Sequence, residues 1–240
     1  LGNVLAVIVG LFAFSIVAML IFFGIIGLVA SSSEKEVTLE SNSILHLDLN
    51  GRTLVERTSE EDLVFGSFLD PFGGENTAGL VNLKKAIGEA KTNENVKGIY
   101  LNAGLIGAGQ AGLLELREAL VDFKESGKFI VAYDEAYSEG GYFLASVADE
   151  IYLNPLGGID FNGFSSEGIF LKGFFEKVGI KPEVFRVGEF KSAVEPFILD
   201  KMSPENRLQT QYFLDDINNH ALELIAKSRG IAQDSLIHIN

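Results

Sequence analysis

The sequence lacks cysteine and tryptophan, and it is poor in basic residues. Without cysteine, these 240 residues cannot form a disulfide framework or a cysteine-ligated metal site. The sequence has 19 Lys and Arg residues and 33 acidic residues. The resulting net charge of −14 excludes a nucleic-acid binder that works through a basic surface. Wholesale disorder is also excluded, because 47% of the residues are hydrophobic and 22% are charged.

Charge of either sign is missing from residues 1–33, so the whole net charge falls on the rest of the chain. Residues 4–30 are uninterrupted by charge or proline, and they exceed the roughly 20 apolar residues that a membrane-spanning helix needs. A secretory signal has a shorter apolar region of about 7–15 residues. We therefore expect a transmembrane anchor over residues 1–33, which contacts lipid through residues 4–30, and one soluble domain over residues 34–240.

The flank that follows the apolar stretch is net acidic, with Glu34, Lys35 and Glu36. Basic flanks remain in the cytoplasm, so an acidic flank is compatible with a domain on the other side of the membrane. The absence of cysteine also fits an oxidising compartment. We expect a single-pass protein with its soluble domain outside the cytoplasm.

Strand patterns alternate with helix patterns along the soluble part. Strands are expected over residues 43–49, 96–102, 128–133, 150–153 and 184–187. Helices are expected over residues 80–90, 113–124, 141–148 and 169–178, with a loop over residues 56–75. A long helix should begin after Ser203, because Ser suits the N-cap, Pro204 the first turn and Glu205 the helix dipole. This alternation predicts an α/β domain with a largely parallel sheet.

A glycine-rich loop lies between an expected strand and an expected helix. Gly107, Gly109 and Gly112 form a GxGxxG pattern, and Asp134 follows at the end of the next strand. This context is typical of a dinucleotide-binding fingerprint. However, four residues separate the strand from Gly107, and glycines at such a place are also ordinary turn chemistry. Both interpretations remain open at this point.

Ser138 precedes Glu139, Gly140 and Gly141 at an expected helix start. A serine at this place could be a nucleophile beside an oxyanion hole. It is equally a good helix N-cap, and the pattern is not GxSxG. The sequence pattern favours the helix N-cap role of Ser138 over the nucleophile role.

Lys191 lies between apolar residues shortly after an expected strand. A partly desolvated lysine loses proton affinity and can act as the general base for a nucleophilic serine. The alternatives are an ordinary surface lysine and a lysine kept charged by nearby Glu195. His46, His220 and His238 are scattered without metal-ligand spacing, so we expect ordinary positions for them and no metal site.

Residues 185–207, FRVGEFKSAVEPFILDKMSPENR, resemble the lysine-bearing segment of the bacterial signal peptide peptidase A family in its long, two-halved form. The similarity extends through VKGIYLN, SGKFIVAYDEAYSEGGYFLAS, ADEIYLNPLGGIDFNGF and the apolar N-terminal stretch. The resemblance implies a ClpP/crotonase-like spiral of βα units and a membrane-anchored serine protease that degrades cleaved signal peptides. It also implies a location at the bacterial inner membrane and a homo-oligomer, a tetramer in the family.

The resemblance further implies an active site shared by two halves. The first half supplies the lysine general base, which corresponds to Lys191, and the second half, outside this chain, supplies the nucleophilic serine. Short family members carry serine directly before Gly-Gly-Tyr, whereas Glu139 occupies that place here and Ser138 is one residue early. The loop from Gly107 to Gly112 then corresponds to a degenerate oxyanion-hole loop. Residues 34–240 are thus expected to be the N-terminal protease half, inactive alone and without cofactor or metal.

Two other functions remain as alternatives. The chain could be a non-catalytic, membrane-tethered scaffold half on the same fold. It could also be a dinucleotide-binding membrane protein that uses the loop from Gly107 to Gly112.

Overall fold

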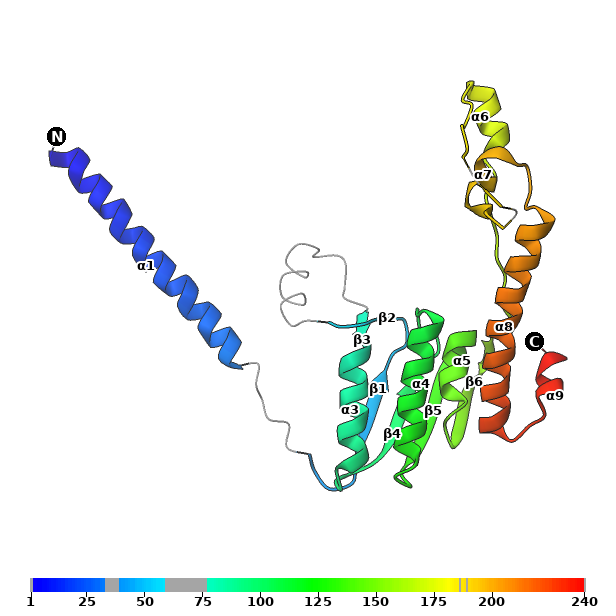
Figure 1. Cartoon of the computed structure of the whole chain (residues 1–240). Helices are drawn as coiled ribbons and strands as arrows, with labels where there is room; N and C mark the ends of the chain where they lie inside the picture. Colours follow the sequence, from blue (N-terminus) through cyan, green and yellow to red (C-terminus); the bar gives the residue numbers. More distant parts are fainter. Residues whose placement is uncertain (1, 33–38, 59–76, 186, 189, 240) are drawn as a thin grey trace. The chain divides into compact units, whose positions relative to one another are not determined.

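The computed structural model describes residues 2–32, 39–58, 77–185, 187–188 and 190–239, and it divides into two compact units, Leu1–Glu40 and Ser41–Asn240. Figure 1 gives the order of the elements. The acidic flank at residues 34–36 lies outside the described residues. The same is true of most of the expected loop at residues 56–75.

The first unit contains one helix, α1 (Gly2–Ser32), which carries no charge. Its stretch Gly2–Gly24 is long and apolar enough, by length and composition, to cross a membrane. At 1.5 Å per residue, these 23 residues span about 35 Å, compared with about 30 Å for the hydrocarbon core of a bilayer. Its described side chains are exposed, so this part of α1 has no covered apolar stripe of the kind that a helix of a soluble domain has.

The second unit alternates strands and helices as the sequence predicts. Its strands are β1 (Ser43–Asp48), β2 (Thr53–Val55), β3 (Thr77–Gly79), β4 (Val96–Asn102), β5 (Phe129–Tyr137) and β6 (Glu150–Ile159). Its helices are α3 (Leu80–Thr92), α4 (Gln110–Lys124), α5 (Glu139–Ala145), α6 (Lys172–Val178), α7 (Glu195–Ile198), α8 (Pro204–Arg229) and α9 (Gln233–Ile237), with a 3-10 turn η1 (Ser192–Val194). The α/β class is therefore confirmed.

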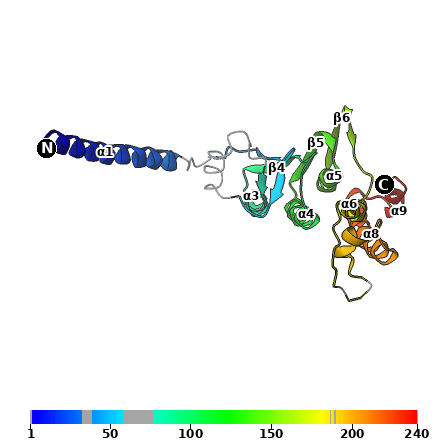
Figure 2. The ribbon, with the colours of Figure 1, turned by 90° about the horizontal axis from the view of Figure 1, so that it is seen from above.

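Four strands form a parallel sheet in the order β1-β4-β5-β6. Parallel neighbours need crossover connections, and α3, α4 and α5 provide them on the same face of the sheet (Figures 1 and 2). Ile99 and Leu101 of β4 are fully buried, as are Leu116, Leu120 and Phe123 of α4. The hydrophobic core of this unit thus includes β4 and α4.

The opposite face of the sheet is only partly covered. Strand register places Ile44, Tyr100 and Tyr152 on this face, because alternate residues of a strand point to opposite sides. Ile44 and Tyr152 are each 52% exposed, and the rings of Tyr100 and His46 lie 5.1 Å apart. An all-parallel sheet normally has both faces covered, so this open face is unusual.

Two parts of the topology differ from the sequence predictions. The parallel pair β2 and β3 was not predicted. The expected strand over residues 184–187 is wrong for its described positions, since Phe185 and Val187 are 95% and 90% exposed and have no strand pairing. A β-prone sequence becomes a strand only where a neighbour accepts its backbone hydrogen bonds, and these described residues have no such neighbour.

The long helix α8 begins as its sequence predicts. Ser203 is the N-cap, and its Oγ accepts a hydrogen bond from the Asn206 N–H at 3.1 Å, with Pro204 in the first turn. Gly230 ends the helix in the left-handed conformation at φ 65°. The capping prediction is confirmed.

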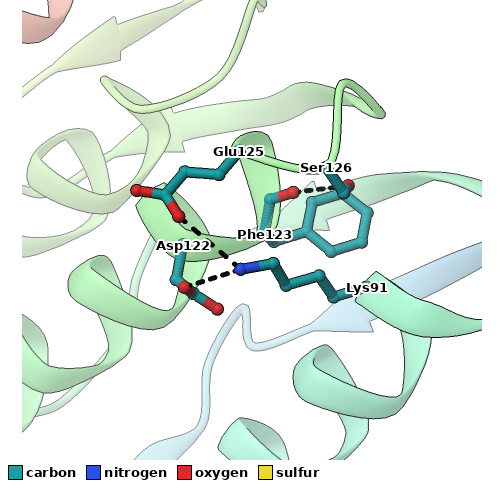
Figure 3. A network of polar contacts seen from close by, with 5 residues as sticks. All are labelled: Lys91, Asp122, Phe123, Glu125 and Ser126. Atoms are coloured by element: carbon teal, nitrogen blue, oxygen red, sulfur yellow. Dashed lines mark hydrogen bonds and ion pairs between the residues drawn. The ribbon is translucent and has the colours of Figure 1, made fainter.

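An ionic cluster joins the carboxyl ends of α3 and α4 (Figure 3). Lys91 Nζ lies 2.7 Å from Asp122 Oδ1 and 3.7 Å from Glu125 Oε2. The hydrogen bond to Asp122 raises the pKa of Lys91 above its ordinary value. Because the cluster lies at the surface, it adds little to the packing that holds the two helices together.

Candidate functional site

A buried polar network joins the carboxyl ends of β1, β4 and β5, the edge at which ligand sites of parallel sheets lie. Asp134 is 3% exposed, and its Oδ1 accepts from Asn50 Nδ2 at 2.9 Å while its Oδ2 accepts from the Gly104 N–H at 2.7 Å. Asn50 Oδ1 in turn accepts from the Leu105 N–H at 3.0 Å. These groups bond to one another, so this network holds the edge of the sheet together.

Ser138 lies beside this network and caps α5. Its Oγ accepts from the Gly141 N–H at 3.1 Å and donates to the Gly104 carbonyl at 2.8 Å. The same carbonyl accepts from the Ser138 N–H at 2.7 Å. The predicted N-cap role is confirmed, and the Ser138 hydroxyl is committed to two backbone partners.

The glycine-rich loop pairs with β2 through Gly107. The Gly107 N–H donates to the Arg52 carbonyl at 2.8 Å, and the Gly107 carbonyl accepts from the Leu54 N–H at 2.7 Å. Gly109 is the N-cap of α4 and has no side chain that could cap it. The backbone of Gly107 thus continues the pairing of β2, which supports the turn interpretation over a phosphate-binding loop.

Lys191 occupies the N-cap position of η1, and its side chain is exposed. The chain that follows is fixed to α6, because the Leu171 N–H donates to the Pro196 carbonyl at 2.7 Å. The ring of Phe197 also stacks on that of Phe175, with centroids 6.2 Å apart and planes 23° apart. Lys191 is therefore presented by a segment that packs against α6.

An ion pair adds to this attachment. Lys172 Nζ of α6 lies 2.8 Å from Asp200 Oδ2, just after α7. The hydrogen bond to Asp200 raises the pKa of Lys172 above its ordinary value. Both side chains are substantially exposed, so we expect this pair to help orient the segment more than to stabilise the fold.

Glu195, four residues after Lys191, is 1% exposed. Its carboxylate accepts hydrogen bonds from Ser203 Oγ at 2.5 Å, from the Ser203 N–H at 3.1 Å and from Asn206 Nδ2 at 2.8 Å. All three donors belong to the amino-terminal end of α8. The structure thus connects the lysine segment to α8 as well as to α6.

The lysine segment and α5 lie near different parts of α8. The lysine segment bonds to Asn206 through Glu195, whereas α5 and α8 line a small pocket that includes Leu222. The rise of 1.5 Å per residue places Asn206 and Leu222 about 25 Å apart along the helix axis. No recorded contact among the described residues joins Lys191 to Ser138, whose hydroxyl bonds to Gly104 and Gly141.

Arg117 is a buried residue that the sequence analysis missed. It is 2% exposed, and it donates to the Phe143 carbonyl and, at 2.8 Å, to Ser146 Oγ of the α5 region. It also donates to the Leu224 carbonyl at 2.8 Å and to Ser228 Oγ at 2.6 Å in α8. Burial lowers its pKa to about 10. Arg117 thus joins α4, α5 and α8 through hydrogen bonds to uncharged groups.

A signal for Arg117 was present in the sequence. The residue lies four positions after Leu113 and three before Leu120, on the apolar face of α4. A charged side chain on such a face needs buried partners. The same side chain lines a groove of about 500 Å³ between α4 and α8.

The three histidines occupy the ordinary positions that the sequence predicts. His46 lies in β1 with Nε2 2.6 Å from Asn102 Oδ1, while His220 of α8 and His238 after α9 are exposed. Within the described part of the chain, no group of three or more His, Cys, Asp or Glu residues is placed to hold a metal ion.

Comparisons with known proteins agree with the resemblance seen in the sequence. The model of peptidase family S49 matches residues 122–239. "Protease 4" of Haemophilus influenzae is 34% identical over 212 residues, covering 87% of this chain and 34% of the relative. "Protease 4" of Salmonella typhi is 34% identical over 230 residues, covering 93% of this chain and 36% of the relative.

A plant protein is similar over a shorter range. "Serine protease SPPA, chloroplastic" of Arabidopsis thaliana is 31% identical over 151 residues, which are 63% of this chain and 22% of that protein. The chain spans about a third of the length of the two bacterial relatives. The match to the model of peptidase family S49 includes the lysine segment, and the chain is similar to the two bacterial relatives over most of its own length.

Proposed function

We propose that this chain is the lysine-donating half of a membrane-anchored serine endopeptidase that degrades cleaved signal peptides. The match of residues 122–239 to the model of peptidase family S49 supports peptide hydrolysis, and two relatives are named Protease 4. Because the chain spans about a third of those relatives, the nucleophilic serine is assigned to sequence beyond residues 1–240.

The arrangement around Lys191 carries this proposal. The lysine is exposed on a segment held by α6 and α8, whereas Ser138 is committed to capping α5. A base presented outward on a fixed segment suits a nucleophile supplied by another part of the protein. Ser138 is not the nucleophile in this proposal.

The chemistry follows the pattern of Ser-Lys hydrolases. The neutral amine of Lys191 takes the proton of the serine hydroxyl while the serine oxygen attacks the peptide carbonyl carbon. The resulting ammonium returns its proton to the leaving amine, and an acyl-enzyme remains. Water, deprotonated by the same amine, then attacks the ester carbonyl carbon. The ester bond breaks, and the ammonium returns its proton to the departing serine oxygen. This scheme needs neither a metal nor a cofactor.

The proposal extends to the fold and the assembly. We assign the βα units to a ClpP/crotonase-like spiral and the whole protein to a homo-oligomer, a tetramer by resemblance. The partly exposed sheet face that carries Ile44 and Tyr152 supports contact with further protein, since parallel sheets are normally covered on both faces. Extended apolar peptides would bind by strand addition with side-chain pockets.

The proposed location is the bacterial inner membrane, with the soluble part on the periplasmic side. The helix α1 supports a single-pass anchor by its length and composition. The net charge of −14 disfavours adhesion to anionic lipid, so the anchor would hold the protein at the membrane.

The test is substitution of Lys191 in the full-length protein. Lys191→Ala should reduce cleavage of a synthetic signal peptide by about 10²–10⁴-fold, the usual contribution of a general base. Lys191→Arg should be equally inactive, because arginine keeps the charge but does not deprotonate. Lys201→Ala, which removes an exposed lysine after α7, is the matched control and should keep wild-type activity.

Retention of cleavage by Lys191→Ala would reject the general-base role. If the full-length protein also assembles normally and binds peptide, such a result favours the second candidate, a membrane-tethered scaffold half that does not take part in the chemistry.

A further inference from the structure

We infer that Glu195 is the residue that positions Lys191, by fixing the lysine segment to the amino-terminal end of α8. This inference rests on the proposed role of Lys191 as the general base. Glu195 acts through the backbone of η1, so it is a positioning residue.

The burial of Glu195 indicates a specific role. A carboxylate that is 1% exposed is costly unless donors satisfy its oxygens. Here Ser203 supplies two donors and Asn206 a third, and both oxygens of Glu195 are used. Hydrogen bonds to an ionised group are about twice as strong as those between neutral groups, and the positive end of the dipole of α8 adds to them.

The connection from Glu195 to Lys191 is short and ordered. Lys191 is the N-cap of η1, Glu195 is its C-cap, and the Glu195 N–H donates to the Ser192 carbonyl. A shift of Glu195 therefore moves Lys191 through a single turn of backbone. The neighbouring residues Pro196 and Phe197 contact α6, so loss of the Glu195 bonds would leave the segment attached mainly on that side.

The consequence for catalysis is geometric. Lys191 and a serine from another part of the protein must lie within hydrogen-bond distance of each other. A displacement of about 1 Å in such a pair can cost on the order of 10²-fold in rate. The buried hydrogen bonds between Glu195 and α8 are the contacts best placed to prevent such a displacement of Lys191.

The experiment measures kcat and KM of the full-length protein with a peptide substrate. Glu195→Ala should lower kcat by about 10²-fold, with KM within about twofold of wild type, because the substrate-binding surface is unchanged. Glu195→Gln should lose only about tenfold, since its amide can still accept from Asn206 and donate to Ser203 Oγ. Glu183→Ala removes an exposed carboxylate from the same region and should behave as wild type.

A double-mutant cycle separates positioning from a general loss of stability. Asn206→Ala removes one donor to Glu195 from a helix position that alanine suits, and it should also lower kcat. If both residues act through one contact, the double variant with Glu195→Ala should be no slower than Glu195→Ala alone. If Glu195→Ala does not fold, a lowered kcat with unchanged KM in Glu195→Gln and in Asn206→Ala still tests the positioning role.

The outcomes distinguish this inference from the proposed function. Wild-type kcat in the Glu195 variants, or fully additive losses, would overturn the positioning role while an inactive Lys191→Ala left the general base intact. Full activity of Lys191→Ala would reject the proposed function itself.

Discussion

Asp149 illustrates how a single partly exposed carboxylate connects β5 with α4. Its Oδ1 lies 2.8 Å from Lys124 Nζ, and its Oδ2 accepts from the Ile130 N–H at 2.8 Å. Burial favours the neutral acid, but the hydrogen bonds from Lys124 and Ile130 outweigh burial and lower the pKa of Asp149. Ionised Asp149 therefore stabilises the folded state.

This arrangement predicts a pH-dependent stability. Because the folded pKa lies below the unfolded value of about 3.9, the contribution of Asp149 is present above that value and is lost as pH falls through the folded pKa. Asp149→Asn should lower the free energy of unfolding at pH 7 by at most about 1 kcal/mol, since the side chain is 43% exposed. Urea unfolding followed by circular dichroism at several pH values measures the difference.

The difference between Asp149→Asn and wild type should disappear once the carboxylate is protonated in the folded protein. Asp216→Asn, at an exposed position of α8, is the control and should change stability little at any pH. A difference that persists undiminished in acid would contradict the electrostatic origin.

Residue roles were predictable where local rules decide them. The caps Ser138 and Ser203 follow from their positions before helices, and the structure confirms both. Arg117 was missed because its partners lie 26 to 111 residues away in the sequence. Asn50 was missed for the same reason, since it bonds to Asp134 across 84 residues.

At the scale of elements, the amino end of α5 is set by close contact between two backbones. A Cβ atom added at Gly141 would lie 2.2 Å from the Gly104 carbonyl oxygen and 2.4 Å from that of Ala103. These obstacles are backbone atoms, which cannot rotate away. The helix can therefore dock here only with glycine at this position.

Two glycine-to-alanine substitutions in helices should consequently have opposite effects. Gly141→Ala should destabilise the protein by at least about 3 kcal/mol, because α5 must move away from its neighbour. Gly88→Ala, in α3 with no atom within 4 Å of the added Cβ, should stabilise it by about 1 kcal/mol. Thermal unfolding midpoints of the two variants provide the test, and a neutral Gly141→Ala would contradict the packing described.

Element boundaries were predictable to different degrees. The strand at residues 96–102 was predicted with the bounds that β4 has, because its apolar run is closed at both ends by turn residues. The strand expected at residues 128–133 extends to Tyr137 as β5, since its last residues pair with the distant end of β6. The parallel pair β2 and β3 joins Thr53 with Thr77. No local sequence pattern predicts a pairing between such distant residues.

At the scale of the whole molecule, α1 predicts how the protein distributes between membrane and water. Deletion of residues 1–33 from the full-length protein should move it from the membrane fraction to the soluble fraction. The intact protein should resist extraction by alkaline carbonate and dissolve in detergent, because burial of an apolar helix does not depend on salt or pH.

A triple lysine substitution that keeps the chain length is a second test of the same helix. Replacing three central apolar residues of α1, such as Ile16, Leu20 and Phe23, by lysine should have the same effect as the deletion. Continued membrane association of both variants would show that another surface binds the membrane.

The whole-molecule class was predictable because alternating strand and helix patterns leave few topologies. The candidate site was predictable only in part. Lys191 was selected by its resemblance to a known segment, whereas its attachment to α6 and α8 depends on contacts that the sequence does not reveal.

The contact between Gly104 and the start of α5 has a consequence for the history of this protein. The Gly104 N–H donates a hydrogen bond to Asp134, and the Gly104 carbonyl accepts one from Ser138. Several groups would therefore have to change together to open an oxyanion site here. A single codon change that placed serine at position 139 would leave those bonds in place. If the proposed reliance on a serine from another part of the protein arose by loss of an earlier serine here, that loss is difficult to reverse in small steps.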